Sequence, residues 1–140
     1  MKKFARITGT GSYLPPKIVT NFDLEKTLNT SDDWITARTG IKERRIVTDE
    51  NTCDLALEAS LNALSMAALN PEDIDLIILA TTTPDKIFPA TATILQDRLG
   101  ASCPAFDLQA VCAGFVFALT TAQQYIENGS AKNILVVGSE

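Results

Sequence analysis

The residue best suited to do chemistry in this sequence is Cys112. It follows a short apolar segment, 105–108, and precedes a stretch, 113–128, with the pattern of a helix. A helix N-terminus carries about half a positive charge and unpaired N–H groups, which favour a thiolate over a thiol. Ala113 and Gly114 leave room for an acyl group to reach the sulfur. The arrangement predicts a nucleophile; the alternative is a buried cysteine that fills the core as a small apolar side chain.

A second candidate site is the pair Trp34 and Arg38. The two residues are four positions apart, so on a helix their side chains share one face. An indole ring beside a guanidinium suits an adenine base, which can stack between them. The simpler interpretation is that Trp34 fills the core and Arg38 makes a surface ion pair.

Lys42, Arg44 and Arg45 form the only dense basic cluster of an acidic chain. The cluster could attract an acidic carrier protein or nucleotide phosphates. We interpret it instead as the solvated end of a strand.

Composition excludes several classes of function. With 46% hydrophobic and 21% charged residues, the 140-residue chain is typical of one folded domain rather than of a disordered protein. A net charge of −5 leaves no broad basic face for nucleic acid. The longest apolar run, 110–119, is too short to cross a bilayer. These features predict a cytoplasmic protein without nucleic-acid or membrane partners.

Metal sites and disulfides are not expected. The sequence has no histidine, and its three cysteines lack the paired spacing of a zinc site or a redox motif. In a reducing compartment they are expected to be free thiols. We assign only structural roles to Cys53 and Cys103.

Strands and helices alternate along the sequence. Continuous apolar segments typical of strands covered on both faces lie at 75–80 and 133–138. Further strands are predicted at 4–11 and, as a short one, at 105–108. Helices are predicted over 21–28, 31–38, 52–69, 89–100 and 113–128. Asn21 and Ser31 are the predicted caps of the first two helices. Leu57, Leu61, Leu64 and Ala68 are the predicted core face of the third helix. The pattern predicts an α/β protein with a mostly parallel sheet.

Seven motifs occur in an order and spacing that resemble one family. They are Gly9–Pro15, Thr30–Ile35, Arg38–Ile41, Ala80–Thr82, Phe88–Pro89, Ala110–Phe115 and Val136–Ser139. Together they resemble the N-terminal part of beta-ketoacyl-acyl-carrier-protein synthase III, a condensing enzyme of the thiolase superfamily.

The resemblance implies a thiolase-like layered fold, with residues 1–140 as its incomplete N-terminal half and a mixed, mostly parallel sheet between helices. In that fold a further strand lies between the first strand and the one at 134–137, so an interior place in the sheet is expected to be empty. We therefore expect the chain to be a segment of a longer enzyme.

The resemblance also implies roles for the candidate residues. Cys112 would carry the acyl group, while Thr30, Trp34 and Arg38 would bind coenzyme A. Phe88 would line the acyl pocket across the interface of a homodimer; packing over the sheet is the alternative for a loop aromatic.

The implied activity is acyl transfer. An acyl-CoA starter, acetyl-CoA by expectation, would form an acyl-cysteine and condense with malonyl-acyl-carrier protein, initiating fatty acid synthesis. Coenzyme A is then part of a substrate, and no cofactor is expected. The family's enolate-stabilising histidine and asparagine belong to its C-terminal half, so the 140-residue segment alone is expected to be inactive.

Two alternatives remain at this point. One is another starter synthase of the superfamily, of the quinolone, olefin or polyketide type. The other is a non-catalytic acyl-CoA-binding subunit, because the lack of histidine fits that interpretation equally well.

Overall fold

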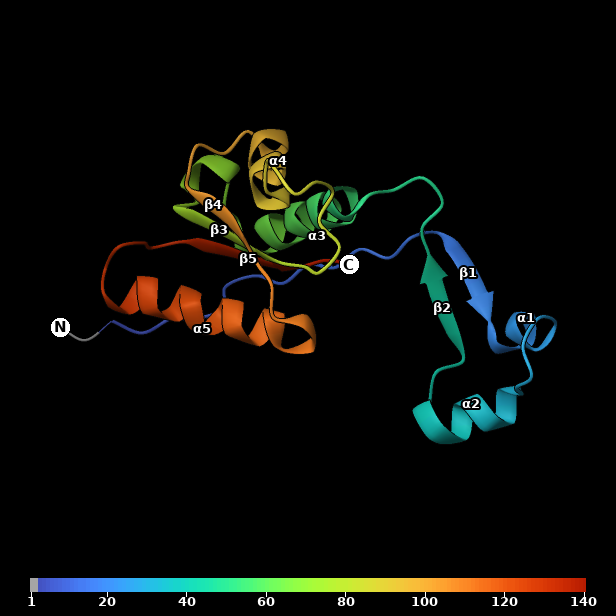
Figure 1. Ribbon diagram of the computed structural model, residues 1–140. Coiled ribbons are helices and arrows are strands. Elements are labelled where there is room, and N and C mark those ends of the chain that lie inside the picture. Colours follow the sequence, from blue (N-terminus) through green and yellow to red (C-terminus); the bar gives the residue numbers. More distant parts are fainter. Residues whose placement is uncertain (1–2) are drawn as a thin grey trace. The chain divides into compact units, whose positions relative to one another are not determined.

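The computed structural model describes residues 3–140, which form two compact units (Figure 1). The larger unit contains residues 3–13 together with Asn51–Glu140, and the smaller unit is Leu14–Glu50. That residues 1–140 belong to one incomplete domain stays a prediction. Each unit is described separately below.

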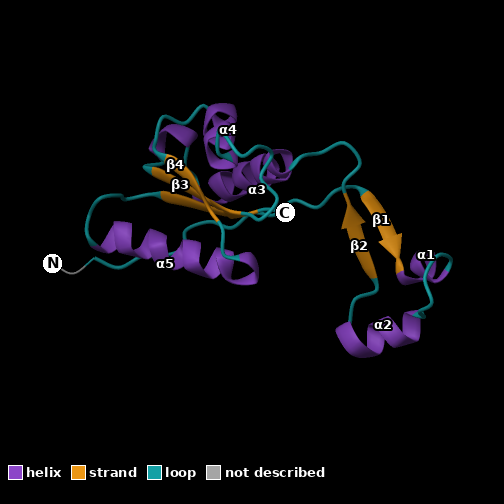
Figure 2. Cartoon of the chain, in the orientation of Figure 1, coloured by secondary structure: helices purple, strands orange, loops and turns teal. Residues whose placement is uncertain are grey.

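The larger unit is built around a parallel sheet. Its strands are β3 (Leu76–Ala80), β4 (Ala105–Leu108) and β5 (Ile134–Gly138), in the order β4-β3-β5 (Figure 2). Both neighbours run parallel to β3. The central strand is buried along its whole length, as expected of a strand covered on both faces. The predicted apolar strands and the parallel sheet are confirmed.

Helices cover both faces of this sheet (Figure 1). α3 (Thr52–Ala67) and α4 (Thr91–Leu99) lie on one face, α5 (Gly114–Glu127) lies on the other, and a short 3₁₀ turn, η1 (Pro71–Asp73), precedes β3. Ile77 and Leu79 of β3 pack toward α3 and α4, whereas Ile78 packs toward α5. The layered α/β fold is therefore confirmed. None of the helices within residues 3–140 combines the length and apolarity that a membrane span requires.

The core face of α3 differs from the predicted one. The buried residues are Cys53, Ala56, Ser60 and Leu64, with Thr52 at the helix start. Leu61, predicted to be buried, is 44% exposed, and Ala68 ends the helix in a left-handed conformation. Leu64 is buried and Leu57 packs against the core, as predicted, but the rest of the buried face consists of smaller side chains, which allow a closer approach to the neighbouring elements.

Residues 4–11 do not form the predicted strand. The segment is not a strand. It runs along α3, where Gly9 and Gly11 allow close contact. A Cβ at Gly9 would lie 2.4 Å from the carbonyl oxygen of Ala63, and one at Gly11 would lie 2.2 Å from that of Ala59. Backbone-to-backbone packing of this kind requires glycine.

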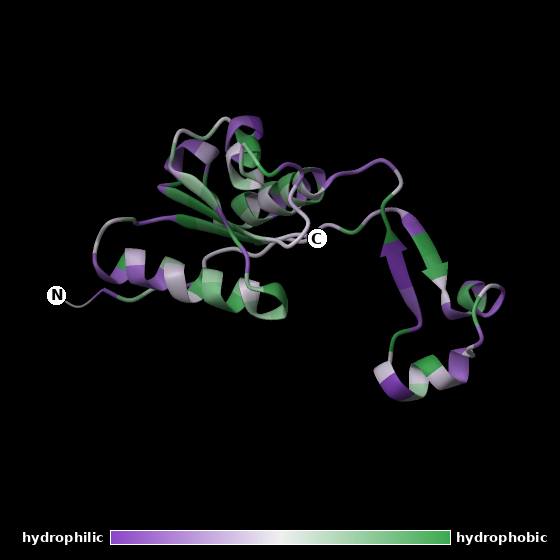
Figure 3. Cartoon of the chain, viewed as in Figure 1, coloured by the Kyte–Doolittle hydropathy of each residue, from purple (hydrophilic) through white to green (hydrophobic). Residues whose placement is uncertain are grey.

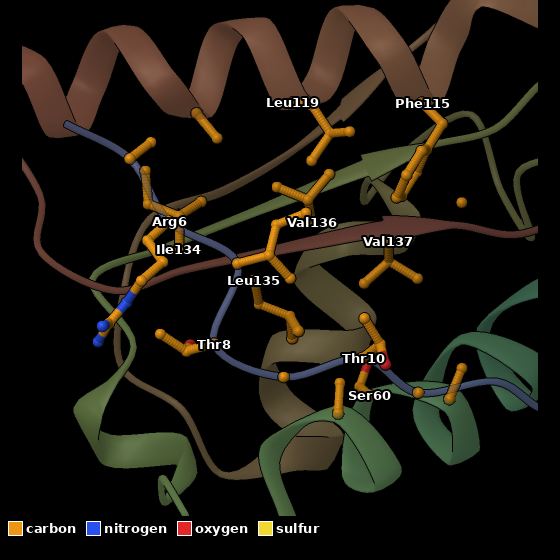
Figure 4. A pocket seen from close by; sticks show the side chains of 18 of the residues that line it. Arg6, Thr8, Thr10, Ser60, Phe115, Leu119, Ile134, Leu135, Val136 and Val137 are labelled. Carbon is orange, nitrogen blue, oxygen red and sulfur yellow. The ribbon is translucent and has the colours of Figure 1, made fainter. Parts of the chain in front are cut away.

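A groove separates this segment from β5. Its volume is about 700 Å³, and it is lined by residues 5–11, by all of β5, and by faces of α3 and α5. In Figure 4, Phe115 and Leu119 project from α5 toward Val136 of β5. Within residues 3–140 no strand pairs with the outer edge of β5. The structure thus has an unfilled place beside β5, where the resemblance implied an interior strand.

The smaller unit contains two strands and two short helices. β1 (Lys17–Thr20) and β2 (Glu43–Ile46) are antiparallel, and α1 (Asn21–Glu25) and α2 (Asp32–Thr39) lie between them in sequence. Figure 3 shows β2 as mainly hydrophilic, in contrast to the hydrophobic β3 of the larger unit.

The first predicted cap of this unit was wrong and the second is confirmed. Thr20, not Asn21, is the N-cap of α1, because its side chain and that of Asp23 form a reciprocal capping box. α1 also ends at Glu25, earlier than predicted. Ser31 caps α2 through a 3.1 Å hydrogen bond that its Oγ accepts from the N–H of Trp34.

Candidate active site

The carboxyl ends of the three parallel strands meet at one edge of the sheet. Ala80 of β3 is in register with Leu108 of β4 and with Gly138 of β5. The segments that follow these strands therefore emerge side by side, as is usual where open α/β sheets bind ligands. They carry the threonines 81–83, Cys112 and Glu140.

Cys112 lies on a sharp turn between β4 and α5. The turn is a 3₁₀ segment, η2 (Val111–Ala113), directly before α5. Val111 has φ +50°, a left-handed conformation that is costly for a β-branched residue, by about 1–3 kcal/mol. A Cβ at Gly114 would lie 3.4 Å from Cβ of Ala80, so the start of α5 is close to the end of β3. The turn leaves Cys112 exposed.

The other two thiols differ from Cys112. Cys53 is fully buried, and this burial raises the pKa of its thiol despite the nearby Arg98. Burial also raises the pKa of Cys103, which is half-buried. The alternative of a buried core cysteine therefore describes Cys53 but not Cys112. No three acidic or cysteine side chains within residues 3–140 are grouped so as to hold a metal ion.

A carboxylate fixes the loop after β3. Glu140 accepts hydrogen bonds from the N–H of Thr82 at 2.9 Å and from the hydroxyls of Thr82 and Thr83 at 2.8 and 2.9 Å. Burial opposes the charge of Glu140, but these bonds outweigh it and lower the pKa of the carboxyl below its ordinary 4.5. Thr52 adds a 2.6 Å bond from its Oγ1 to the carbonyl of Thr83.

A second carboxylate fixes the far end of the same loop. Asp107 of β4 accepts hydrogen bonds from the N–H groups of Thr91 and Ala92, at 2.9 and 2.7 Å. It thereby supplies the cap of α4, whose N-cap residue Ala90 has no side chain to do so. α4 begins two residues after Pro89, where a helix start was predicted.

The tip of this loop is apolar and projects into solvent. Ile87 and Phe88 are 101% and 88% exposed, and the Phe88–Pro89 peptide bond is cis. Packing of Phe88 over the sheet, the simpler interpretation of this residue, is therefore wrong. Its role in an acyl pocket stays a prediction.

The predicted coenzyme A residues lie in the smaller unit. Trp34 is 53% exposed, and the guanidinium carbon of Arg38 lies 4.3 Å from the centroid of its ring. The two side chains thus share one face of α2, as predicted. Inserting an adenine between them would need about 7 Å, two van der Waals contacts, so the base must use the other face of Trp34 or displace Arg38. Thr30 is half-buried and directly precedes the cap of α2.

The basic cluster is used within the smaller unit. Arg44 donates a 2.9 Å hydrogen bond to Oδ1 of Asn21, and Arg45 donates one of 3.4 Å to the carbonyl of Pro15. Both arginines belong to β2, which confirms a strand at this position, but Arg44 is half-buried within the strand and is not at a solvated end.

Three residues hold the candidate site residues in place through roles that the sequence does not predict. Glu140 and Asp107 act through hydrogen bonds to distant segments, which no local pattern reveals. Asn21 was interpreted as a cap, although Thr20 and Asp23 have the spacing of a capping box, a signal that the sequence does contain.

The matching family model and the curated relatives of this chain carry the same name. The sequence model described as 3-Oxoacyl-[acyl-carrier-protein (ACP)] synthase III matches residues 106–140, which include Cys112. A beta-ketoacyl-[acyl-carrier-protein] synthase III from Vesicomyosocius okutanii is 70% identical over 140 residues, 100% of this chain and 45% of that relative.

Solved structures show the same similarity. The crystal structure of 3-oxoacyl-[acyl-carrier-protein] synthase III from Aquifex aeolicus VF5 superposes with a TM-score of 0.92 at 52% identity, covering 99% of this chain and 44% of the other. The priming beta-ketosynthase of the R1128 polyketide pathway gives 0.93 at 37% identity, covering 98% and 42%. The chain thus spans less than half the length of these proteins.

Proposed function

We propose that this chain supplies the nucleophile of a beta-ketoacyl-[acyl-carrier-protein] synthase III, as its N-terminal part. A relative of that name is 70% identical over the whole chain, and the family model matches residues 106–140 around Cys112. The substrates are an acyl-CoA starter and a malonyl-acyl-carrier protein, and the assembly is a homodimer. Coenzyme A enters as part of a substrate, not as a resident cofactor.

The first chemical step takes place at Cys112. Its thiolate attacks the thioester carbonyl of the acyl-CoA, the carbon–sulfur bond to coenzyme A breaks, and the departing thiolate takes up a proton. The product is an acyl-cysteine.

The second step is a condensation. The malonyl group loses carbon dioxide, the freed electron pair attacks the acyl-cysteine carbonyl, and the cysteine thiolate leaves. The enolate oxygen needs hydrogen-bond donors. By the family resemblance, a histidine and an asparagine beyond Glu140 provide them.

The placement of Cys112 is the observation that carries this proposal. Among the three cysteines it alone is exposed. It lies at the carboxyl edge of a parallel sheet, on a strained turn before a 14-residue helix, inside the segment that matches the family. A purely structural cysteine has no need of such a turn.

The test uses the full-length protein and acetyl-CoA. Peptide mass analysis is expected to find one acetyl group on Cys112, and Cys112→Ser is expected to remove most of the activity, because a hydroxyl is a far weaker nucleophile than a thiolate. Cys103→Ser, at the half-buried thiol, is the matched control and is expected to retain activity. Acetylation of Cys53 or Cys103 would contradict the assignment.

The close superposition on a priming ketosynthase of polyketide synthesis favours one second candidate. In that case the chemistry at Cys112 is the same, but the product enters a secondary pathway. Competition between acetyl-CoA and longer acyl-CoA starters for the full-length enzyme separates the two: preference for acetyl-CoA supports fatty acid initiation.

A further inference from the structure

Asn21 is the most completely buried polar residue of the smaller unit. Its relative exposure is 0%, although asparagine is usually found at surfaces. A buried amide is tolerated only when its donors and acceptor have partners, since each unmet group costs about 1–3 kcal/mol. Its hydrogen bonds therefore show what the residue holds in place.

The side chain of Asn21 bonds to three separate segments. Its Nδ2 donates to Oδ1 of Asp32 and to the carbonyl oxygen of Ile41, both at 2.8 Å. Its Oδ1 accepts the 2.9 Å bond from Arg44 on β2. The backbone N–H of Asn21 also donates to the carbonyl of Lys42 at 3.0 Å. Asp32 is the first residue of α2 and Ile41 follows its end, so one amide holds both ends of this helix.

Besides the bonds of Asn21, helix α2 is attached to α1 by a hydrogen bond that the N–H of Asp32 donates to the carboxylate of Glu25. Helix α2 is eight residues long, and none of its residues is buried. A helix of this length is not stable by itself in water, and its position normally comes from an apolar face packed on a core. With no such face, the hydrogen bonds of Asn21 are the main attachment of α2 to the β1–β2 pair.

We infer that Asn21 is a positioning residue for recognition of the coenzyme A nucleotide, acting through α2 on Trp34 and Arg38. The inference rests on the proposed function. Asn21 touches neither the reacting atoms nor the nucleotide. It fixes the direction in which the exposed Trp34–Arg38 stack faces, and loss of its bonds would let the helix rotate or fray.

The test compares two thioesters on full-length protein. Acetyl-CoA carries the adenine nucleotide, whereas acetyl-N-acetylcysteamine presents the same thioester without it. For Asn21→Ala we expect the KM for acetyl-CoA to rise by about tenfold, with kcat little changed, because binding is lost equally in the ground and transition states. Acetylation of Cys112 by the short thioester is expected to keep its wild-type rate.

A second variant, which removes fewer hydrogen bonds than Asn21→Ala, keeps the test valid if Asn21→Ala does not fold. Asn21→Asp keeps the shape and the bond to Arg44 but places a carboxylate oxygen against Asp32 and the Ile41 carbonyl, so it weakens the link to α2 alone. The double variant Asn21→Asp/Asp32→Asn restores a donor between these positions and is expected to recover much of the lost affinity. Thr27→Ala, an exposed polar side chain of the same unit, is the control and leaves KM unchanged.

The outcomes of these experiments distinguish the positioning role of Asn21 from the proposed function on which it rests. A KM for acetyl-CoA that stays at the wild-type value in both Asn21 variants, or an equal loss with both thioesters, would overturn the positioning role alone. Wild-type protein that neither thioester acetylates would contradict the proposed function as well. A selective rise in KM that the double variant reverses supports the inference.

Discussion

Each of the two units of this chain is stabilised internally by a different kind of interaction. In the larger unit Ile77, Ile78, Leu79 and Leu95 are all fully buried between helices and sheet. Among residues 14–50, all of which the structure describes, the buried ones are Pro15 and Asn21. Apolar packing organises one unit, and a network of hydrogen bonds around a single amide organises the other.

This difference matches what each unit presents. The larger unit holds a strained turn before Cys112. Val111 itself is 69% exposed, so the strain is offset by the packing of the unit that carries the turn and not by contacts of the Val111 side chain. The smaller unit presents an exposed indole and a guanidinium, which need a defined direction but no deep core. Hydrogen bonds are directional, so a polar network can fix the direction of these side chains without burying the apolar area of a core.

The largest effect is expected when residues 1–140 are produced alone. The groove beside β5 leaves an apolar surface, and no strand of the described residues 3–140 pairs with the outer edge of β5; both features favour aggregation. We expect an insoluble or partly unfolded protein, at most slow acetylation of Cys112, and no condensation with malonyl-acyl-carrier protein. Size-exclusion chromatography and thermal melting followed by circular dichroism test this. A monomer that melts cooperatively would contradict it.

A matched pair of isoleucine substitutions compares the units directly. Ile77→Ala empties a fully buried site in β3 and is expected to lower the free energy of unfolding by about 2–5 kcal/mol. Ile35→Ala, on α2, removes a half-buried side chain and adds a better helix former, so its cost is expected to stay below about 1 kcal/mol. Urea denaturation of the full-length protein measures both. Equal costs would show that the smaller unit has an apolar core after all.

Substitutions in the Trp34–Arg38 stack test the exposed surface of the smaller unit. Trp34→Ala or Arg38→Ala is expected to raise the KM for acyl-CoA by about tenfold to a hundredfold, the loss of a stacking or charge-assisted contact worth about 1–3 kcal/mol. The effect on kcat is expected to be smaller. Steady-state kinetics with acetyl-CoA measures the split, with Asp33→Asn on the same helix as control. A collapse of kcat at unchanged KM would reject this role.

A small effect on stability is expected at Glu140 in the larger unit. Glu140→Gln keeps the shape but removes the charged acceptor of three hydrogen bonds, at a cost of about 1 kcal/mol. Because folding lowers the pKa of this carboxyl, its contribution is complete above its ordinary value of 4.5 and is lost as the pH falls below that value. Melting curves of wild type and variant should therefore converge in acid. A gap that persists at low pH would assign the stabilisation to another cause.

Sequence patterns predict the larger unit well because its signals are local. Runs such as Leu-Ile-Ile-Leu in β3, Gly100 after α4 and Asn128-Gly129 after α5 mark elements without reference to distant residues. The segment 4–11 has the composition of a strand, but a strand also needs a neighbour, and none lies beside it within residues 3–140.

The smaller unit is harder to predict, as Asn21 illustrates. Its partners lie 11 to 23 residues away, and asparagine is equally suited to cap a helix and to form the centre of a buried hydrogen-bond network.

In the larger unit, the left-handed conformation of Val111 cannot be predicted from the sequence, because valine disfavours it. The position of Cys112 was therefore predictable, while the turn that exposes it was not.

The stack of Arg38 on Trp34 has an optical consequence. Trp34 is the sole tryptophan of these 140 residues, so the indole fluorescence of this chain originates entirely in the smaller unit. The fluorescence emission would change when the guanidinium is displaced or an adenine base binds, but it would not report on changes in the parallel sheet. Circular dichroism, dominated by the helices of the larger unit, would follow that unit instead. Two spectroscopic signals thus observe the two units separately, without any added label.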